Sequence, residues 1–127
     1  MDTGTDFQCL TEAIYHEARG ESFAGQMYVA FVIRNRVESE YFPDDFCSVI
    51  KAPWQFSYNH KLNSLDMVDK KALRIAKEVS YMVLTVDRVP ISEHVLYYHA
   101  SYVTPAWDYD KIQMYATVGN HIFYEDL

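Results

Sequence analysis

The chain has 127 residues; 50% are hydrophobic, 23% are charged, and Gly and Pro occur four times each. This composition is typical of one ordered globular domain over residues 1–127 and excludes a disordered or collagen-like chain. The formal net charge is −7 and no basic run occurs, so a protein that binds nucleic-acid phosphates is not expected. The longest apolar run, residues 27–33, is far shorter than the roughly 20 residues of a membrane span, so none is expected.

The first part of the chain predicts two helices. Thr5 and Gln8 form a capping-box pattern that would start the first helix, and Gly20 would end it. A second helix is expected over residues 24–38, because its segment 27–33 is apolar on every side, as in a buried central helix.

The middle of the chain predicts two more helices. A short helix over residues 46–51 would be capped by Asp44 or Asp45. Residues 52–64 look irregular, and a third long helix is expected over residues 66–86. The apolar side chains expected to face inward from this helix are Leu73, Ala76, Val83 and Leu84.

The C-terminal part predicts a small antiparallel sheet. Residues 95–99 have the composition of a strand, and residues 111–118 alternate apolar and polar side chains. Gly119 and Asn120 separate the second run from residues 121–124, which is the signal of a two-residue hairpin. The sequence therefore predicts an α+β domain, mainly helical with a C-terminal antiparallel β-sheet.

Glu17 is the clearest candidate for a catalytic residue. It shares the helical face of Leu10 and Ile14, so burial should raise the pKa of its carboxyl group. Its place in the last turn of the helix, near the negative end of the dipole, acts in the same direction. Both effects suit a general acid. The alternative from the same pattern is that Glu17 only forms an ion pair, with Arg19 or Arg34.

Other polar residues give weaker signals. Glu21 follows the helix end and fits a solvated loop acid or a helix cap better than a functional residue. His16 and Glu17 begin like the zinc motif H-E-x-x-H, but Gly20 stands at the fifth position. No metal and no cofactor are therefore expected. Asn35 closes an apolar helix and is expected to hold a neighbouring loop.

Two features leave alternatives open. Cys9 and Cys47 permit one disulfide, or they are two buried thiols. Residues 54–58 and 97–99 mix rings with hydrogen-bonding groups, a combination that suits either a sugar-binding groove or a core.

Strand geometry predicts which face of the C-terminal sheet each polar residue points to. Because consecutive strand residues point to opposite faces, Tyr97 and Tyr98 should not line the same groove. Ile122 is more apolar than His121, so we expect Ile122 to point inward and His121 outward. His121 would then face a groove opposite Glu17.

Several short segments of the chain together carry a further signal: residues 9–10, 13–21, 25–26, 32–37, 42–47, 55–57, 97–100, 105–107 and 119–124. Among them, the E-A-R-G-E segment at residues 17–21 is fairly specific. These residues resemble the cell wall hydrolase family of the SleB/CwlJ type, which includes the spore cortex-lytic enzymes and relatives in Gram-negative bacteria and phages. The resemblance covers nearly the whole chain.

The resemblance implies a lysozyme-like catalytic domain that cleaves the MurNAc–GlcNAc bond of peptidoglycan glycan strands. We expect the protein to be a monomer. The essential acid of the family is the first glutamate of E-A-R-G-E, which is Glu17 here. Family members that cut spore cortex act as lytic transglycosylases. The residues expected to bind the substrate are Glu21, Gln55, Phe56, Tyr98, His99, Trp107 and His121.

Two other functions are compatible with the family resemblance. A water-using muramidase would ordinarily need a second carboxylate, for which Glu21 is nearest in sequence. A non-catalytic glycan-binding module of the same fold is a further alternative. No signal peptide is visible, which suggests either a phage endolysin that stays in the cytoplasm until released or a bacterial enzyme whose leader has been removed. In both cases the protein would act on the wall, from the periplasm or outside the cell. The charge of −7 is unusual for a protein that binds anionic wall polymers.

Overall fold

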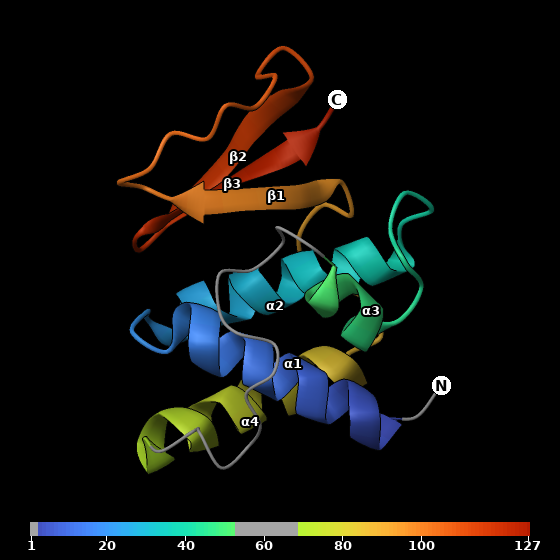
Figure 1. Cartoon of the computed structure of the whole chain (residues 1–127), viewed down its shortest axis with the longest axis vertical. Helices are drawn as coiled ribbons and strands as arrows, with labels where there is room; N and C mark the ends of the chain where they lie inside the picture. The colour runs from blue at the N-terminus through green and yellow to red at the C-terminus, as the bar shows by residue number, and fades with distance from the viewer. Residues whose placement is uncertain (1–2, 53–68) are drawn as a thin grey trace.

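A computed structural model describes residues 3–52 and 69–127 (Figure 1). The elements, in chain order, are α1 (Thr3–Ala18), α2 (Phe23–Glu38), α3 (Phe46–Lys51), α4 (Lys70–Thr85), β1 (Val95–Ala100), β2 (Ile112–Val118) and β3 (His121–Asp126). Figure 1 shows the sheet at one end of the molecule and α4 at the other, with α1 and α2 between them. The predicted α+β class is confirmed. Within the described ranges, no helix is long and apolar enough to cross a membrane.

The helix boundaries follow the sequence signals closely, with one correction. The helix α1 begins at Thr3, so Thr5 already has a helical backbone and is not the N-cap that its capping-box pattern predicts. The short helix α3 is capped as expected, because the Asp45 carboxylate accepts a hydrogen bond from the Ser48 N–H at 2.8 Å. The helix α4 begins after its own cap, Asp69, and the predicted residues before it lie outside the described part.

The central helix α2 joins the other elements through three consecutive polar side chains. Arg34 donates hydrogen bonds to carbonyls at the C-terminal end of α4, which have no partner within that helix. Asn35 donates to the carbonyls of Ser92 and Val95 at 3.0 and 3.1 Å, so the predicted role of Asn35 in holding a loop is confirmed. The Arg36 Nε donates to a β1 carbonyl at 2.8 Å. These bonds place α4 and β1 on either side of α2.

The three strands form an antiparallel sheet in the order β1-β3-β2. The β2–β3 turn contains Gly119 at φ 57°, in the left-handed region that the predicted hairpin requires. Phe123 is fully buried, and its ring lies 5.1 Å from that of Tyr28 on α2, measured between centroids. The face of the sheet that carries Phe123 therefore packs against the helices.

The predicted orientation of β3 is wrong. His121 is 7% exposed and, two residues before Phe123, points to the same inner face, whereas Ile122 lies on the outer face and is half-buried. The inner face accepts an imidazole because Tyr98 contacts it edge-on and a carboxylate lies next to its ring nitrogen. Relative apolarity alone therefore gave the wrong face.

Cys9 and Cys47 form a disulfide that joins α1 to α3. Of the two alternatives for this pair, the structure supports the disulfide. The bond fixes the short helix α3 against the outer side of α1, and the buried residues Phe46, Val49 and Ile50 of α3 complete that part of the core.

We expect the substitution Asn35→Leu to lower the free energy of unfolding by about 1–3 kcal/mol, because the buried carbonyl of Val95 and the partly buried carbonyl of Ser92 would lose their donor. Urea denaturation at neutral pH measures this change. The substitution Gln113→Leu on the exposed face of β2 serves as the control and should stay within about 0.5 kcal/mol of the parent protein. Equal stability of the two variants would contradict the role assigned to Asn35.

Candidate functional site

Glu17 lies in the last turn of α1, on the face that packs into the core. Leu10 and Ile14 on this face are fully buried, and Glu17 itself is half-buried. The predicted place of Glu17 on the helix is therefore confirmed. The side chain lies at the edge of the core, where it is partly shielded from water and still partly exposed.

The arginines that sequence reasoning offered as partners of Glu17 make other contacts. Arg34 pairs with Glu38 (Nε–Oε2 3.4 Å) besides its bonds to α4. The Arg19 guanidinium carbon lies 4.7 Å from the centroid of the Tyr15 ring. The Tyr15 hydroxyl in turn accepts a hydrogen bond from the backbone N–H of Asp69 at 3.0 Å. Tyr15 therefore links Arg19 at the end of α1 to the start of α4.

The turn between α1 and α2 holds the backbone of Glu21 on both sides. The Glu21 N–H donates to the carbonyl of Ala18 at 2.9 Å, and the Gln26 side chain donates to the Glu21 carbonyl at 3.2 Å. Ser22 caps α2 by accepting a hydrogen bond from the Gly25 N–H at 3.2 Å. The next helix therefore starts immediately after Glu21, one turn of chain beyond Glu17.

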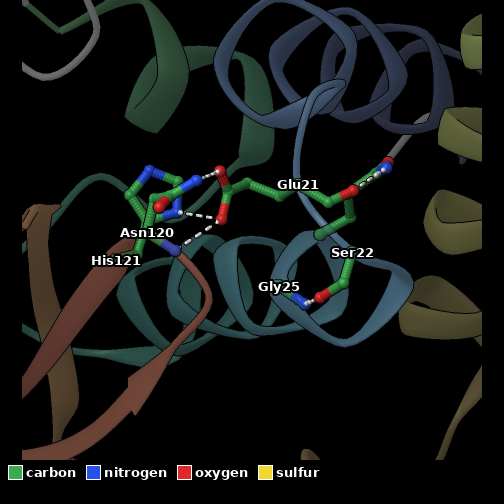
Figure 2. Close-up of polar contacts among 6 residues, drawn as sticks. Glu21, Ser22, Gly25, Asn120 and His121 are labelled. Carbon is green, nitrogen blue, oxygen red and sulfur yellow. Dashed lines mark hydrogen bonds and ion pairs between the residues drawn. The ribbon is translucent and has the colours of Figure 1, made fainter.

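The carboxylate of Glu21 binds the turn between β2 and β3 (Figure 2). Its Oε1 accepts a hydrogen bond from the Asn120 backbone N–H at 2.9 Å, and its Oε2 accepts one from the Asn120 side-chain Nδ2 at 3.0 Å. Gly119 leaves room for this approach, because a Cβ there would lie 2.6 Å from Glu21 Oε1. Both carboxylate oxygens therefore hold the turn.

His121 is the neighbour of this carboxylate on the inner face. Its Nδ1 is buried and lies 3.8 Å from Glu21 Oε1, and no residue of the ranges 3–52 and 69–127 forms a hydrogen bond with it. Burial lowers the pKa of His121, against the opposing effect of the Glu21 charge. Burial raises the pKa of Glu21, but the two Asn120 hydrogen bonds and the nearby His121 outweigh it and lower that pKa overall. Near neutral pH, Glu21 is an anion and His121 is neutral.

The structure brings three of the predicted site residues together on the inner face of the sheet. The Tyr98 ring lies 5.2 Å from the His121 ring, and His121 contacts Glu21. Tyr97 points to the other face and contacts Trp107, with 6.1 Å between ring centroids. The prediction that the two tyrosines face opposite sides is confirmed.

His99 and Trp107 lie on the outer face of the sheet, apart from Glu21 and His121. The His99 Nδ1 donates to the carbonyl of Ala100 at 2.8 Å, which leaves Nε2 to accept from the Tyr124 hydroxyl at 2.9 Å. The Trp107 ring contacts the His99 ring edge-on at 5.4 Å. These rings cover one another and form a separate aromatic cluster.

Some predicted site residues receive no structural test, and one contributor was missed. Gln55 and Phe56 lie outside the described residues. Asn120 was interpreted only as a hairpin residue, and no local signal indicated that it would bind a carboxylate 99 positions away. Across residues 3–52 and 69–127, no cluster of three or more His, Cys, Asp or Glu side chains could hold a metal ion.

Comparison with known proteins gives the family. The family model described as Cell Wall Hydrolase matches residues 20–124, which is most of the chain. The chain belongs to the cell wall hydrolase family. A spore cortex-lytic enzyme of Halalkalibacterium halodurans is 31% identical over 118 residues, covering 93% of this chain and 34% of that protein. The enzyme of Bacillus subtilis with the same description is 29% identical over 127 residues, covering 97% and 38%. The chain therefore spans little more than a third of these relatives.

Solved structures of this cell wall hydrolase family share the fold. The catalytic domain of the germination-specific lytic transglycosylase SleB from Bacillus anthracis aligns with a TM-score of 0.68 at 28% identity, covering 97% of this chain and 94% of that one. The catalytic domain of the Bacillus cereus SleB protein aligns with a TM-score of 0.73, also at 28% identity, covering 94% and 89%. The family predicted from the sequence is confirmed.

We expect the stability of the domain to fall as the pH is lowered, in two steps. Below about pH 6.5 the unfolded chain binds a proton at His121 that the folded state resists, so unfolding becomes easier. Below about pH 4.3 the unfolded chain also binds a proton at Glu21, whose folded pKa is lowered.

Urea titrations from about pH 3 to pH 8 measure both steps. The substitution His121→Gln should flatten the upper step, and Glu21→Gln should flatten the lower one. A parent protein whose stability rises on acidification from pH 7 to pH 5 would contradict the assignment.

Proposed function

We propose that this chain cleaves the MurNAc–GlcNAc bond of peptidoglycan glycan strands as a lytic transglycosylase, with Glu17 as the single acid and base. Support comes from the half-buried place of Glu17 at the end of α1 and from the likeness to a SleB lytic transglycosylase domain. The wall itself would be the site of action.

The reaction needs only one carboxyl group. Protonated Glu17 gives its proton to the glycosidic oxygen as the bond from that oxygen to C1 of the muramyl sugar breaks. The muramyl 6-hydroxyl oxygen then bonds to C1, and the Glu17 carboxylate takes the hydroxyl proton. The proton thus moves from O6 to the leaving oxygen, Glu17 returns to its acid form, and no water is consumed.

The observation that carries this choice is the engagement of Glu21. A muramidase that uses water ordinarily needs a second carboxylate as a base or nucleophile. Glu21 is the nearest candidate along the chain, but both its oxygens accept hydrogen bonds from Asn120, and its pKa is lowered. A carboxylate stabilised in this way is a weak base. The arrangement therefore favours the muramyl 6-hydroxyl over water as the nucleophile.

Substrate contacts are proposed from the inner face of the sheet. Tyr98 and His121 lie beside the two hydrogen bonds between Glu21 and Asn120, which we call the Glu21 clasp. Glu21 would act by fixing the β2–β3 turn, which holds His121 in place. Trp107 and His99 are predicted contacts too, but they lie on the outer face, so a glycan on the inner face would reach them only around an edge of the sheet. Gln55 and Phe56 remain predictions from the sequence.

We expect Glu17→Gln to lower glycan cleavage by about 100-fold or more, because the amide keeps the shape of the side chain and cannot transfer the proton. The measurement is fragment release from purified sacculi, with mass spectrometry of the products. Anhydromuramyl ends identify a transglycosylase, reducing ends a water-using muramidase, free stem peptides an amidase, and no release a binding module.

The control for this variant is Glu40→Gln on the exposed surface, which should keep the activity of the parent protein. Activity of Glu17→Gln within a few-fold of the parent, at an unchanged melting temperature, would refute the role of Glu17.

The substitution Glu21→Gln tests the same proposal from the other side. It should lower the melting temperature, because its amide NH₂ would face a donor of Asn120, and it should reduce kcat far less than Glu17→Gln. Thermal unfolding and turnover measured on the same preparations separate the two effects. A loss of kcat as large as that of Glu17→Gln in fully folded protein would instead indicate that Glu21 activates water.

A further inference from the structure

The first eight residues of α4 concentrate positive charge in an acidic protein. Lys70, Lys71, Arg74 and Lys77 stand there, against a formal net charge of −7 for the chain with 11 Lys and Arg in all. All four side chains are exposed, and none forms an ion pair with another residue of the described ranges. These cations are therefore available to an external anion.

Three of the four cations form one row. Residues separated by four, then three, positions share a face of a helix, so Lys70, Arg74 and Lys77 line up on α4, a set that we call the basic row. Seven positions at 1.5 Å per residue give the row a length of about 10 Å. The residues that α4 buries lie on its opposite side: Ala72, Ala76, Val79, Ser80 and Val83.

The basic row starts near the C-terminal half of α1, the helix that carries Glu17. Asp69, just before Lys70, donates its backbone N–H to the Tyr15 hydroxyl, and Tyr15 lies two residues before Glu17. Arg19 stacks on the same tyrosine ring and adds a further exposed cation at this end of α1. In Figure 1 the C-terminal end of α1, the N-terminal end of α4 and the β2–β3 turn all lie on the left side of the molecule.

We propose that the basic row, together with Arg19, binds carboxylate groups on the peptide stems of peptidoglycan strands. This inference rests on the proposed function, because it takes the same polymer as the ligand. Neighbouring cations of the row are separated by a helical turn, about 5–6 Å between Cβ atoms, and do not converge on one point. Such spacing suits several separate carboxylates along a polymer better than it suits a single phosphate.

The row has a direct physical effect on encounter with the wall. A molecule of charge −7 is repelled by an anionic polymer as a whole, but at physiological salt the field of each charge is screened beyond about 8 Å. Within that distance the basic row attracts carboxylates and orients the end of α1 toward the strand. Binding should therefore weaken as salt is added.

The test uses a triple variant, Lys70→Gln, Arg74→Gln and Lys77→Gln. Its matched control is Lys51→Gln, Arg88→Gln and Lys111→Gln, which removes two lysines and one arginine at exposed positions elsewhere. Both are assayed on purified sacculi freed of phosphate-bearing polymers (native sacculi) and on these sacculi with their peptide carboxylates converted to amides (amidated sacculi). A third substrate is sacculi that keep their phosphate-bearing polymers. For the parent protein, the triple variant and the control, kcat and KM are measured with Glu17 intact. Binding is measured by co-sedimentation of the same three proteins after Glu17→Gln has been added to each.

We expect the triple variant to raise KM on native sacculi about tenfold, since each exposed charge pair contributes about a factor of two, with kcat and melting temperature unchanged. The control should match the parent protein, and on amidated sacculi parent and triple variant should coincide. Equal binding of parent and triple variant to native sacculi, or an equal loss on both substrates, would overturn the proposal. A loss confined to sacculi that keep their phosphate polymers would assign the row to phosphate instead.

Co-sedimentation separates this inference from the proposed function. A parent protein that releases no fragments, yet is retained by native sacculi through the basic row, would refute the cleavage activity and support the row. If the parent protein and the triple variant cleave and bind native sacculi equally well, the cleavage activity is supported and the role of the basic row is refuted.

Discussion

One buried carboxylate connects the two halves of this domain. Glu21 stands between α1 and α2, and its two oxygens bind the backbone and the side chain of Asn120, 99 positions later. Only 10% of the Glu21 side chain is exposed, so the charge depends on these donors. Glycine at position 119 allows the approach. The clasp therefore sets where the sheet lies relative to the end of α1, and with it the distance from Glu17 to Tyr98 and His121.

The helices and strands could be predicted because each has a local signal. The apolar segment 27–33 marked the central helix, Asp45 marked the start of α3, and Gly119 marked the hairpin turn. The start of α1 was less certain, because Thr5 is as compatible with a helical first turn as with a cap. The connections made by Arg34 and Arg36 had no local signal, since their partners are backbone carbonyls about 50 and 60 residues away.

The candidate site was only partly predictable, for a related reason. The helical face of Glu17 follows from a period of 3.6 residues, so its place could be inferred from α1 alone. The orientation of His121 depends on a carboxylate from the other half of the chain, and a comparison of His121 with Ile122 could not include it. Likewise, His99 and Tyr98 look equivalent in sequence, and only the register of β1 with β3 shows that Tyr98, not His99, shares the inner face with Phe123. Alternation predicted the separation of the faces but not which face meets the helices.

The disulfide between Cys9 and Cys47 gives the helical layer a stability that depends on redox conditions. The two cysteines are 38 positions apart, and cross-linking a loop of that size restricts the unfolded chain by about 4 kcal/mol in the chain-entropy model. The free energy of unfolding of an ordinary domain is only about 5–15 kcal/mol. In the oxidised molecule, α3 and α1, the helix that carries Glu17, are therefore held together far more firmly than in the reduced one. Reduction of this single bond would therefore weaken the helical layer without touching any side chain of the sheet.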